Sequence, residues 1–273
     1  MGVIRYGARL NILVSVKGHP FERDAFAALF DAMPDIEATF VDQPAASELM
    51  SCDGLARYDA LVLYDMPGLD FAHDDRPGLV APPEAFKEKF RALLDAGKGV
   101  VALHHAIAGW PAWEEYAELL GGRFLYRRAA LREEMRPDSG YRHDVAHHVH
   151  VAQDHKVTSG LPEQFSLTDE LYLFEVFEES VTPILRSSYA FKKENFYSAA
   201  LAVNGRLYCN EGWSHEDGSN LIGWVKRARK SPLVYLQPGD GPATYKDENY
   251  RHLIENAIRW VASKEALDWA RAA

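Results

Sequence analysis

The chain has 273 residues, of which 47% are hydrophobic and 26% charged, and this composition excludes a disordered or fibrous protein. No apolar run approaches the roughly 18 residues that a membrane-spanning helix needs, and no signal peptide is recognisable. The formal net charge of −10 argues against a nucleic-acid partner, because phosphate binding needs a positive field. With only two cysteines, too few for a disulfide framework, the chain is expected to be reduced and cytoplasmic.

The first part of the chain alternates between short apolar runs and helical patterns. Apolar runs predict strands at 10–16, 36–41, 61–64 and 99–103. Apolar residues at helical spacing predict helices at about 21–33, 83–96 and 113–120. This order of elements is typical of an α/β fold with three layers, built on a doubly wound, mostly parallel sheet of the flavodoxin-like kind.

The second part is expected to be richer in strands. Residues 123–150 are polar and basic, which favours a long loop over one face, followed by strands at 147–151, 172–177 and 183–185. Runs at 199–203 and 207–209 flank Asn204-Gly205, a pair that predicts an added β-hairpin. A strand at 233–236 and a helix at about 250–261 complete the chain. No linker divides it, so residues 1–273 are interpreted as a single domain.

Polar residues follow the predicted parallel strands at the point where each strand ends. They are His19, Asp65, the adjacent pair His104 and His105, and Asp240. Ligands of open α/β sheets bind outside the carboxyl ends of the strands, so we expect these side chains to converge on one site.

Several segments also resemble a known family. They are Gly99 to Ala106 with His104-His105, Trp113 to Phe124, Asp154 to Pro162, Leu167 to Tyr172, Ser231 to Asp240, and the final helix 251–260. Together they resemble the trehalose-utilisation (ThuA-like) proteins, which share the class I glutamine amidotransferase-like fold. The resemblance implies that fold over nearly the whole chain and a link to sugar metabolism. Two features differ from the family pattern: Asp240 follows Gly239 where a histidine is common, and segment 210–220 is longer.

The best-known reaction of that fold is not expected here. A glutaminase needs an activated cysteine at the turn after the central strand, and the matching position is His104. Cys52 and Cys209 lie elsewhere, and no Gly-x-Ser-x-Gly elbow is present. Glutamine hydrolysis is therefore excluded from the functions considered.

The histidines allow two kinds of chemistry. His148 and His150 lie at alternate positions of a predicted strand, so both can ligate one metal ion, zinc or manganese, with Glu170, Glu175 or Asp240 completing the site. Without a metal, His104 or His105 is the general base, and Asp240 or Glu170 orients it. Both alternatives stay open at this stage.

The substrate-binding candidates are His19, Asp65, Trp110, His155 and Tyr172, since aromatic rings suit the C–H face of a sugar. The leading hypothesis is an enzyme, a hydrolase, lyase or isomerase, acting on trehalose, a keto-sugar or another small carbohydrate-like ligand. The alternatives are a non-catalytic sugar-binding or interaction module and a metal-dependent hydrolase of other substrates. A homo-oligomer is left open.

Overall fold

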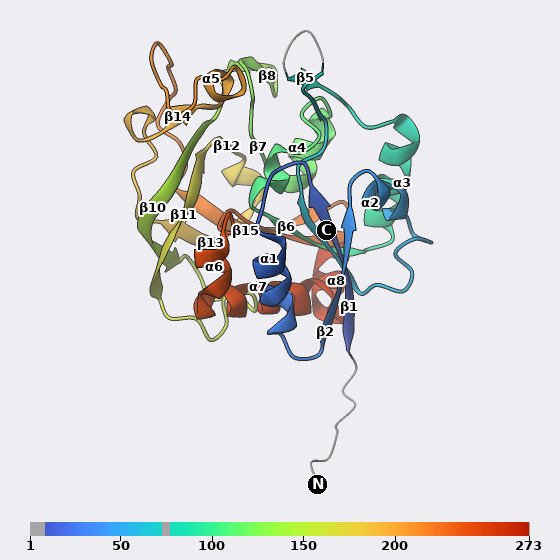
Figure 1. Ribbon diagram of the computed structural model, residues 1–273. Helices are drawn as coiled ribbons and strands as arrows, with labels where there is room; N and C mark the ends of the chain where they lie inside the picture. The colour runs from blue at the N-terminus through green and yellow to red at the C-terminus, as the bar shows by residue number, and fades with distance from the viewer. Residues whose placement is uncertain (1–8, 73–76, 273) are drawn as a thin grey trace.

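The computed structural model describes residues 9–72 and 77–272, and its centre is a twisted mixed sheet covered by helices (Figure 1). Ten strands form this sheet, nine of them in the order β11-β10-β13-β15-β16-β6-β3-β1-β2, with β14 paired to β10. Its parallel half consists of β1 (Leu10–Lys17), β2 (Ile36–Asp42), β3 (Ala60–Asp65), β6 (Gly99–Leu103) and β16 (Ser231–Leu236).

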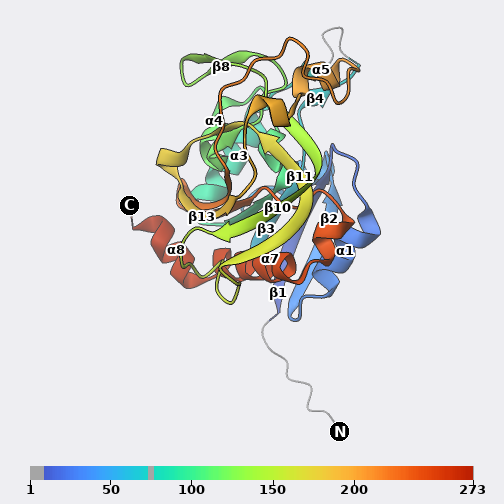
Figure 2. The same cartoon turned by 90° about the vertical axis from the view of Figure 1, so that its left-hand side faces the viewer.

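The other half is an antiparallel extension beyond β16. It comprises β15 (Leu221–Ala228), β13 (Thr182–Ser187), β10 (Gly140–Val151), β11 (Gln164–Leu173) and β14 (Tyr197–Ser198). Figure 2 shows β10 and β11 as a long curved pair. Three two-stranded sheets complete the strands: β4 (Leu69–Asp70) with β5 (Gly78–Leu79), β7 (Gly122–Arg123) with β12 (Glu175–Val176), and β8 (Ala129–Leu131) with β9 (Glu134–Arg136).

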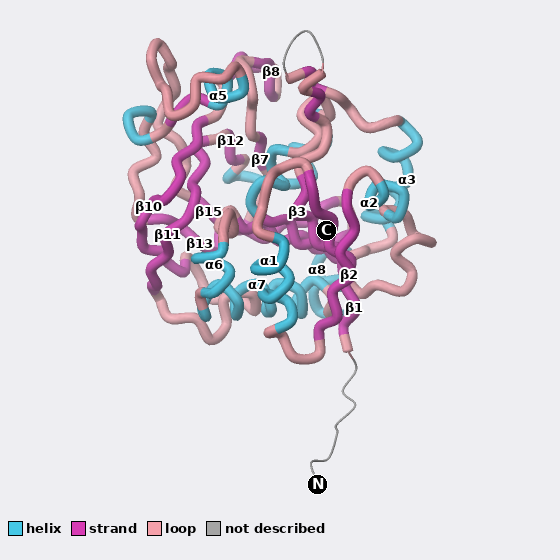
Figure 3. Tube along the Cα trace, in the orientation of Figure 1, coloured by secondary structure: helices cyan, strands magenta, loops and turns pink. Residues whose placement is uncertain are grey.

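Helices cover both faces of the parallel half because its strands are apolar on both sides. One face packs against α1 (Arg23–Asp31), α6 (Pro242–Lys246), α7 (Glu248–Val261) and α8 (Lys264–Arg271). The opposite face packs against α2 (Ala45–Leu49), α3 (Glu84–Asp95), α4 (Glu114–Leu120) and the 3₁₀ helix η1 (His104–Ala108). Figure 3 shows α1, α6 and α7 grouped on the same side of the strands. The remaining short helices are α5 (Ala199–Val203), η2 (Glu178–Ser180) and η3 (Lys193–Asn195).

Side chains that alternate along each strand divide the core into these two layers. Ile12 and Val14 point toward Phe26 and the apolar stripe of α7, whereas Leu13 points toward Phe90 on the other face. The three layers expected from the sequence are therefore present, and the predicted strands and helices of residues 10–120 lie within a few residues of the observed ones.

Two expectations for the second part are wrong. Segment 123–150 is not one long loop, because β10 already begins at Gly140 and pairs with β11 along its length. Segment 199–209 is not a hairpin: residues 199–203 form helix α5. The Ser198 hydroxyl caps this helix by accepting a hydrogen bond from the Leu201 amide at 3.1 Å. Gly205, with a φ of 84°, follows the helix end, where a glycine is favoured as readily as in a turn.

Strand direction decides which residues share an edge. The parallel strands all end at one edge of the sheet, which we call the carboxyl edge. Three successive antiparallel pairings lead from β16 to β10 and a fourth to β11, so β11 also ends at the carboxyl edge and β10 begins there. The loop after β10, which carries His155, consequently lies at the opposite edge.

Alternation along β10 separates its histidines. His147 is 5% exposed and its Nδ1 lies 2.8 Å from the Ser187 hydroxyl, whereas His148 and His150 are exposed. Burial lowers the pKa of the His147 imidazole to about 4.

We expect this buried imidazole to make the fold sensitive to mild acid. The folded-state pKa of about 4 is below the ordinary histidine value of 6.5, so between these pH values the unfolded chain binds the proton and the folded chain does not. The free energy of unfolding therefore falls by about 2 kcal/mol between pH 7 and pH 4.5 on account of His147. Urea denaturation of His147→Leu should lack this loss, while the exposed His150→Leu should retain it. Equal pH dependence in the two variants would contradict the assignment.

Candidate functional site

His104 occupies the sharp turn between β6 and η1, at the centre of the carboxyl edge. Its side chain is fully buried, and its backbone has a φ of 45°, in a region that residues other than glycine rarely adopt. The Tyr235 hydroxyl donates to the His104 carbonyl oxygen at 3.0 Å and fixes the turn against β16. Such a strained conformation at a strand end is typical of functional sites.

The hydrogen bonds of the His104 ring define its tautomer. Nδ1 lies 2.6 Å from the backbone carbonyl oxygen of Gln237, and because a carbonyl only accepts, Nδ1 carries a proton. Nε2 is thereby directed toward a group of acidic and phenolic oxygens. It lies 3.0 Å from Glu170 Oε2, 3.5 Å from Asp240 Oδ1 and 2.8 Å from the Tyr172 hydroxyl.

The antiparallel extension supplies the groups that face His104. Glu170 and Tyr172 lie near the end of β11, and the pairing of Arg142 with Leu171 leaves His143 beside Glu170, at the start of a bulge in β10 between Arg142 and Val145. His143 Nε2 lies 3.4 Å from Glu170 Oε1, and its Nδ1 lies 4.0 Å from an Asp240 oxygen. We refer to these four residues, His104, His143, Glu170 and Asp240, as the His104 cluster.

The turn after β16 is held by a third carboxylate, that of the buried Asp169. Asp169 accepts hydrogen bonds from the amides of Gly239 at 2.6 Å and Asp240 at 3.1 Å. Burial raises the pKa of Asp169 to about 6. On the other side of the turn, the Tyr64 hydroxyl donates to the Gly239 carbonyl oxygen at 2.9 Å. Asp169 and Tyr64 thus act as positioning residues for Asp240.

The imidazole of His104 compensates the negative charges of Glu170 and Asp240. Burial would lower the pKa of His104, but its hydrogen bonds and charge interactions with Asp240 and Glu170 outweigh burial and raise that pKa well above its usual value. Burial likewise raises the pKa of Asp240, yet the hydrogen bond and charge of His104 bring it below the usual carboxyl range. Among the described residues, no lysine or arginine forms an ion pair with either carboxylate.

A small cavity opens over the cluster. Its volume is about 220 Å³, and its polar lining is His19, His143, Glu170 and Tyr172. Aromatic and aliphatic side chains form the walls, among them Phe71, Phe124, Tyr126, Tyr141 and Leu207. Asp240 and His143, with side chains 27% and 36% exposed, are the more exposed members of the cluster, and of these two His143 lines the cavity. His104 and Glu170 support them from below.

Several residues proposed from the sequence therefore meet at this edge. His104, Glu170, Asp240 and Tyr172 are in mutual contact, and the His19 ring packs over His105 with centroids 4.8 Å apart. His105 itself points away from the carboxylates and hydrogen-bonds through Nε2 to the Tyr64 carbonyl oxygen at 2.9 Å. Burial and the neighbouring histidines lower the pKa of His105 well below its usual value.

Asp65 and Trp110 lie at the carboxyl edge but outside this cavity. Asp65 is buried, and its Oδ2 accepts hydrogen bonds from Ser15 at 2.8 Å and Gln43 at 2.5 Å. Trp110 packs on Phe86 and lines a separate, neighbouring pocket of about 720 Å³. The structure therefore gives neither of them a place in the cavity above the cluster.

His148, His150 and His155 are not brought to the cluster. His148 pairs with Ser166, four residues before Glu170, which corresponds to roughly 13 Å along the strand. His150 lies two residues further away, and His155 packs on Trp260 at the opposite edge. The direction of β10 explains this outcome, because its histidine-rich end runs away from the carboxyl edge.

Three residues that complete the site were not singled out from the sequence. They are His143, Asp169 and the backbone of Gln237. His143 lies four residues before His147, and the pairing of β10 with β11, in which Arg142 faces Leu171, brings it next to Glu170. Asp169 is adjacent to Glu170 in the sequence, and its buried side is set by the alternation of β11.

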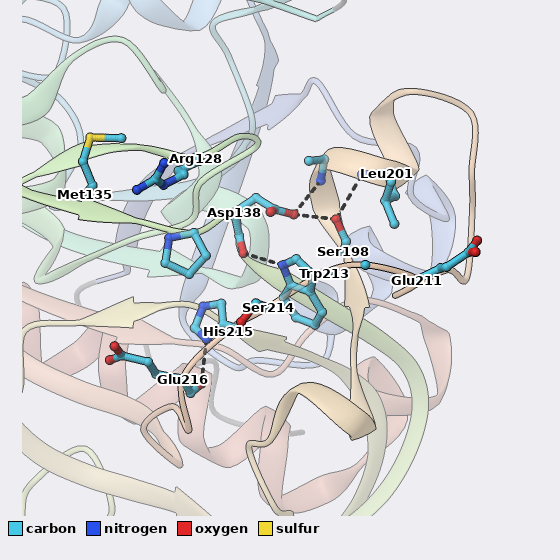
Figure 4. Close-up of a pocket in the computed structure, with 13 residues that line it drawn as sticks. Arg128, Met135, Asp138, Ser198, Leu201, Glu211, Trp213, Ser214, His215 and Glu216 are labelled. Atoms are coloured by element: carbon cyan, nitrogen blue, oxygen red, sulfur yellow. Dashed lines mark hydrogen bonds between the residues drawn. The ribbon is translucent and has the colours of Figure 1, made fainter.

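A third pocket, of about 490 Å³, lies where residues 211–216 pack near Asp138 and Ser198 (Figure 4). Trp213 donates from its ring nitrogen to the Asp138 carbonyl oxygen at 3.1 Å. The Asp138 carboxylate accepts from the Ser198 hydroxyl at 2.5 Å and the Ala200 amide at 3.0 Å (Figure 4). These contacts anchor the lengthened segment and the start of α5, so we assign this region a structural role.

The comparison with known families now identifies the chain. The family model described as "ThuA: Trehalose utilisation" matches residues 11–261. The chain belongs to the ThuA family. No curated protein matches its sequence. The family is therefore what its sequence relatives establish.

Solved structures show the same fold in distant relatives. A ThuA-like protein from Parabacteroides merdae is 13% identical, with a TM-score of 0.65 over 93% of this chain and 90% of its own. A ThuA-like protein from Bacteroides uniformis is 19% identical, with a TM-score of 0.57 over 97% and 96%. A GMP synthase protein from Thermoplasma acidophilum is 12% identical, with a TM-score of 0.53 over 97% and 100%. The expected glutamine amidotransferase-like fold of this ThuA family member is thus confirmed.

In the described part of this ThuA family member, no helix is both long and apolar enough to cross a membrane. Cys52 is exposed and Cys209 half-buried, and both are free thiols. Neither lies at the turn that His104 occupies.

Gly239 provides a test of how the turn positions Asp240. Its φ of 130° favours glycine, and a Cβ atom would lie 2.2 Å from the Tyr250 hydroxyl oxygen. Gly239→Ala should reduce the free energy of unfolding by about 2–4 kcal/mol. Gly241, two residues on, has a φ of −147°, and a Cβ atom there would meet nothing within 4 Å, so Gly241→Ala should change stability by less than about 1 kcal/mol. Chemical denaturation measures both, and equal losses would contradict the proposed strain.

Proposed function

We propose that this ThuA family member is an enzyme of carbohydrate utilisation that exchanges protons with a sugar bound in the cavity above the His104 cluster. The observation that carries this proposal is the convergence of two carboxylates and two imidazoles beneath a small cavity with aromatic walls. Groups of both kinds within hydrogen-bond reach of one another supply what general acid–base catalysis requires. The family's description, trehalose utilisation, supports a carbohydrate as substrate.

The cavity favours a small ligand. Its volume of about 220 Å³ is below the roughly 300–1,000 Å³ of pockets for drug-sized molecules. A single sugar ring is the unit we assign to it. The apolar faces of Phe124 and Tyr126 suit the C–H side of a pyranose, while Glu170 and Tyr172 offer hydrogen-bonding partners for hydroxyl groups.

Accessibility determines the roles that we assign. His143 lines the cavity and exchanges the proton with substrate, and Asp240, the other exposed member of the cluster, lies beside it and shares that proton. Glu170 and His104 are buried and hold these two groups in place. Removal of a proton next to the carbonyl of a keto-sugar leads to isomerisation or elimination, and protonation of a glycosidic oxygen leads to hydrolysis. Of these, proton abstraction from a keto-sugar is the reaction class we favour.

We also place this activity in the cytoplasm. The free cysteines Cys52 and Cys209 suit a reducing compartment, and a similar structure from Salmonella typhimurium, 14% identical with a TM-score of 0.55, is described as a cytoplasmic protein.

Proton exchange can be measured without knowing the final product. The protein is incubated in D₂O with trehalose, glucose and their keto derivatives, and NMR follows deuterium incorporation at carbons next to the carbonyl. We expect His143→Gln and Asp240→Asn to lower kcat for exchange by about 10²–10⁴-fold, the usual contribution of general acid–base catalysis. KM should change less than kcat, because these groups act on the proton rather than anchor the ring.

His150→Gln is the matched control, since this exposed histidine lies on the same strand as His143 but toward the other edge. It should exchange protons at the parental rate. If sugars raise the Tm of the protein but none is exchanged or converted, the enzyme proposal is wrong, and the cavity serves a non-catalytic sugar-binding module instead.

A further inference from the structure

We propose that His104 Nε2, Glu170 and Asp240 together bind one divalent transition-metal ion, of the zinc or manganese type. One ligand atom from each of these residues lies within 4.8 Å of the other two. This site differs from the strand pair His148 and His150, whose side chains are exposed near the other edge of the sheet.

The spacing of the three groups matches that of ligands around one ion. His104 Nε2 lies 3.0 Å from Glu170 Oε2 and 3.5 Å from Asp240 Oδ1. With metal–ligand bonds of 2.0–2.2 Å, neighbouring ligand atoms are about 2.8–3.1 Å apart in octahedral and about 3.3–3.6 Å apart in tetrahedral coordination. Both distances from His104 therefore fit one coordination sphere, and the Glu170 and Asp240 oxygens lie within 4.8 Å of each other.

The hydrogen bond on the far side of His104 is a second, independent indication. Histidines that ligate metals almost always donate their other ring N–H to a carboxylate or a backbone carbonyl, which fixes the tautomer and the ring orientation. His104 donates from Nδ1 to the Gln237 carbonyl oxygen at 2.6 Å. Asp240 is also held from behind, since its amide donates to Asp169 at 3.1 Å.

Charge favours a cation at this position. Glu170 is 4% exposed and Asp240 27% exposed, and within residues 9–72 and 77–272 their ion-pair partners are the imidazoles of His104 and His143 alone. Burying two carboxylates without a permanent cation is costly. Imidazole nitrogen combined with carboxylate oxygen suits zinc or manganese better than the all-oxygen sites that calcium and magnesium prefer.

Three protein ligands leave at least one coordination position free, as in catalytic metal sites. His143 lies next to both carboxylates and lines the cavity. A ligand in the cavity would thus meet the ion and His143 together. Metal binding does not rest on the proposed function, because it can be measured without any sugar.

The test uses the full chain without a polyhistidine tag, stripped of metals with a chelator. Isothermal titration with Zn²⁺ and with Mn²⁺ should show one ion per chain, and Co²⁺ should produce visible d–d absorption bands. Glu170→Gln and Asp240→Asn should each weaken binding by more than about 100-fold, since changes even beyond the direct ligands cost about 10–100-fold. Circular dichroism and Tm confirm that each variant is folded, and Asp240→Asn serves if the buried Glu170→Gln is not.

The double variant His148→Gln/His150→Gln is the matched control and should bind as the parent does. The proposal is overturned if the parent binds no stoichiometric ion, or if binding survives in Asp240→Asn and is lost in the double variant. Deuterium exchange on the same samples separates the two proposals. Exchange by metal-free protein alongside failed metal binding refutes only the metal site, and metal binding without exchange refutes only the enzyme.

Discussion

The hydrogen bond from His104 to the Gln237 carbonyl oxygen is the constraint on which the candidate site depends. It joins the ends of two adjacent parallel strands, β6 and β16, and at the same time leaves Nε2 as the ring atom that faces Glu170, Asp240 and Tyr172. Because the His104 side chain is fully buried, the ring cannot turn without leaving polar atoms unpaired. Glu170 and Asp240 belong to the candidate site because they lie 3.0 Å and 3.5 Å from this fixed nitrogen.

Two halves of the sheet contribute different parts of the site. The parallel half provides His104 and the turn that carries Asp240, as expected for strands that all end at one edge. The antiparallel extension provides Glu170 and His143, although these residues are close neighbours neither of His104 nor of each other in the sequence. The register of β10 with β11 is decisive, because Arg142 pairs with Leu171 and the next residue, His143, therefore lies beside Glu170 just before the strand bulges.

The turn that carries His104 holds a different side chain from the cysteine that a glutaminase of this fold needs there. In that fold the turn presents a nucleophile, and here it presents a buried imidazole between carboxylates. The backbone at this turn has a φ of 45° in this chain. With that geometry the turn directs Nε2 of His104 toward Glu170, Asp240 and Tyr172.

The sequence by itself determined the layers, the parallel strands and the place of His104, His19 and Asp240, because apolar runs and helical spacing are local signals. It also pointed to Glu170 as a carboxylate partner of the histidines and to Tyr172 as an aromatic ring suited to a sugar. Only the tertiary structure decided that His148, His150 and His155 lie away from the site and that His143 belongs to it. The reason is that strand direction and the register of a long antiparallel pair are set by pairing between distant segments, which no pattern within β10 records.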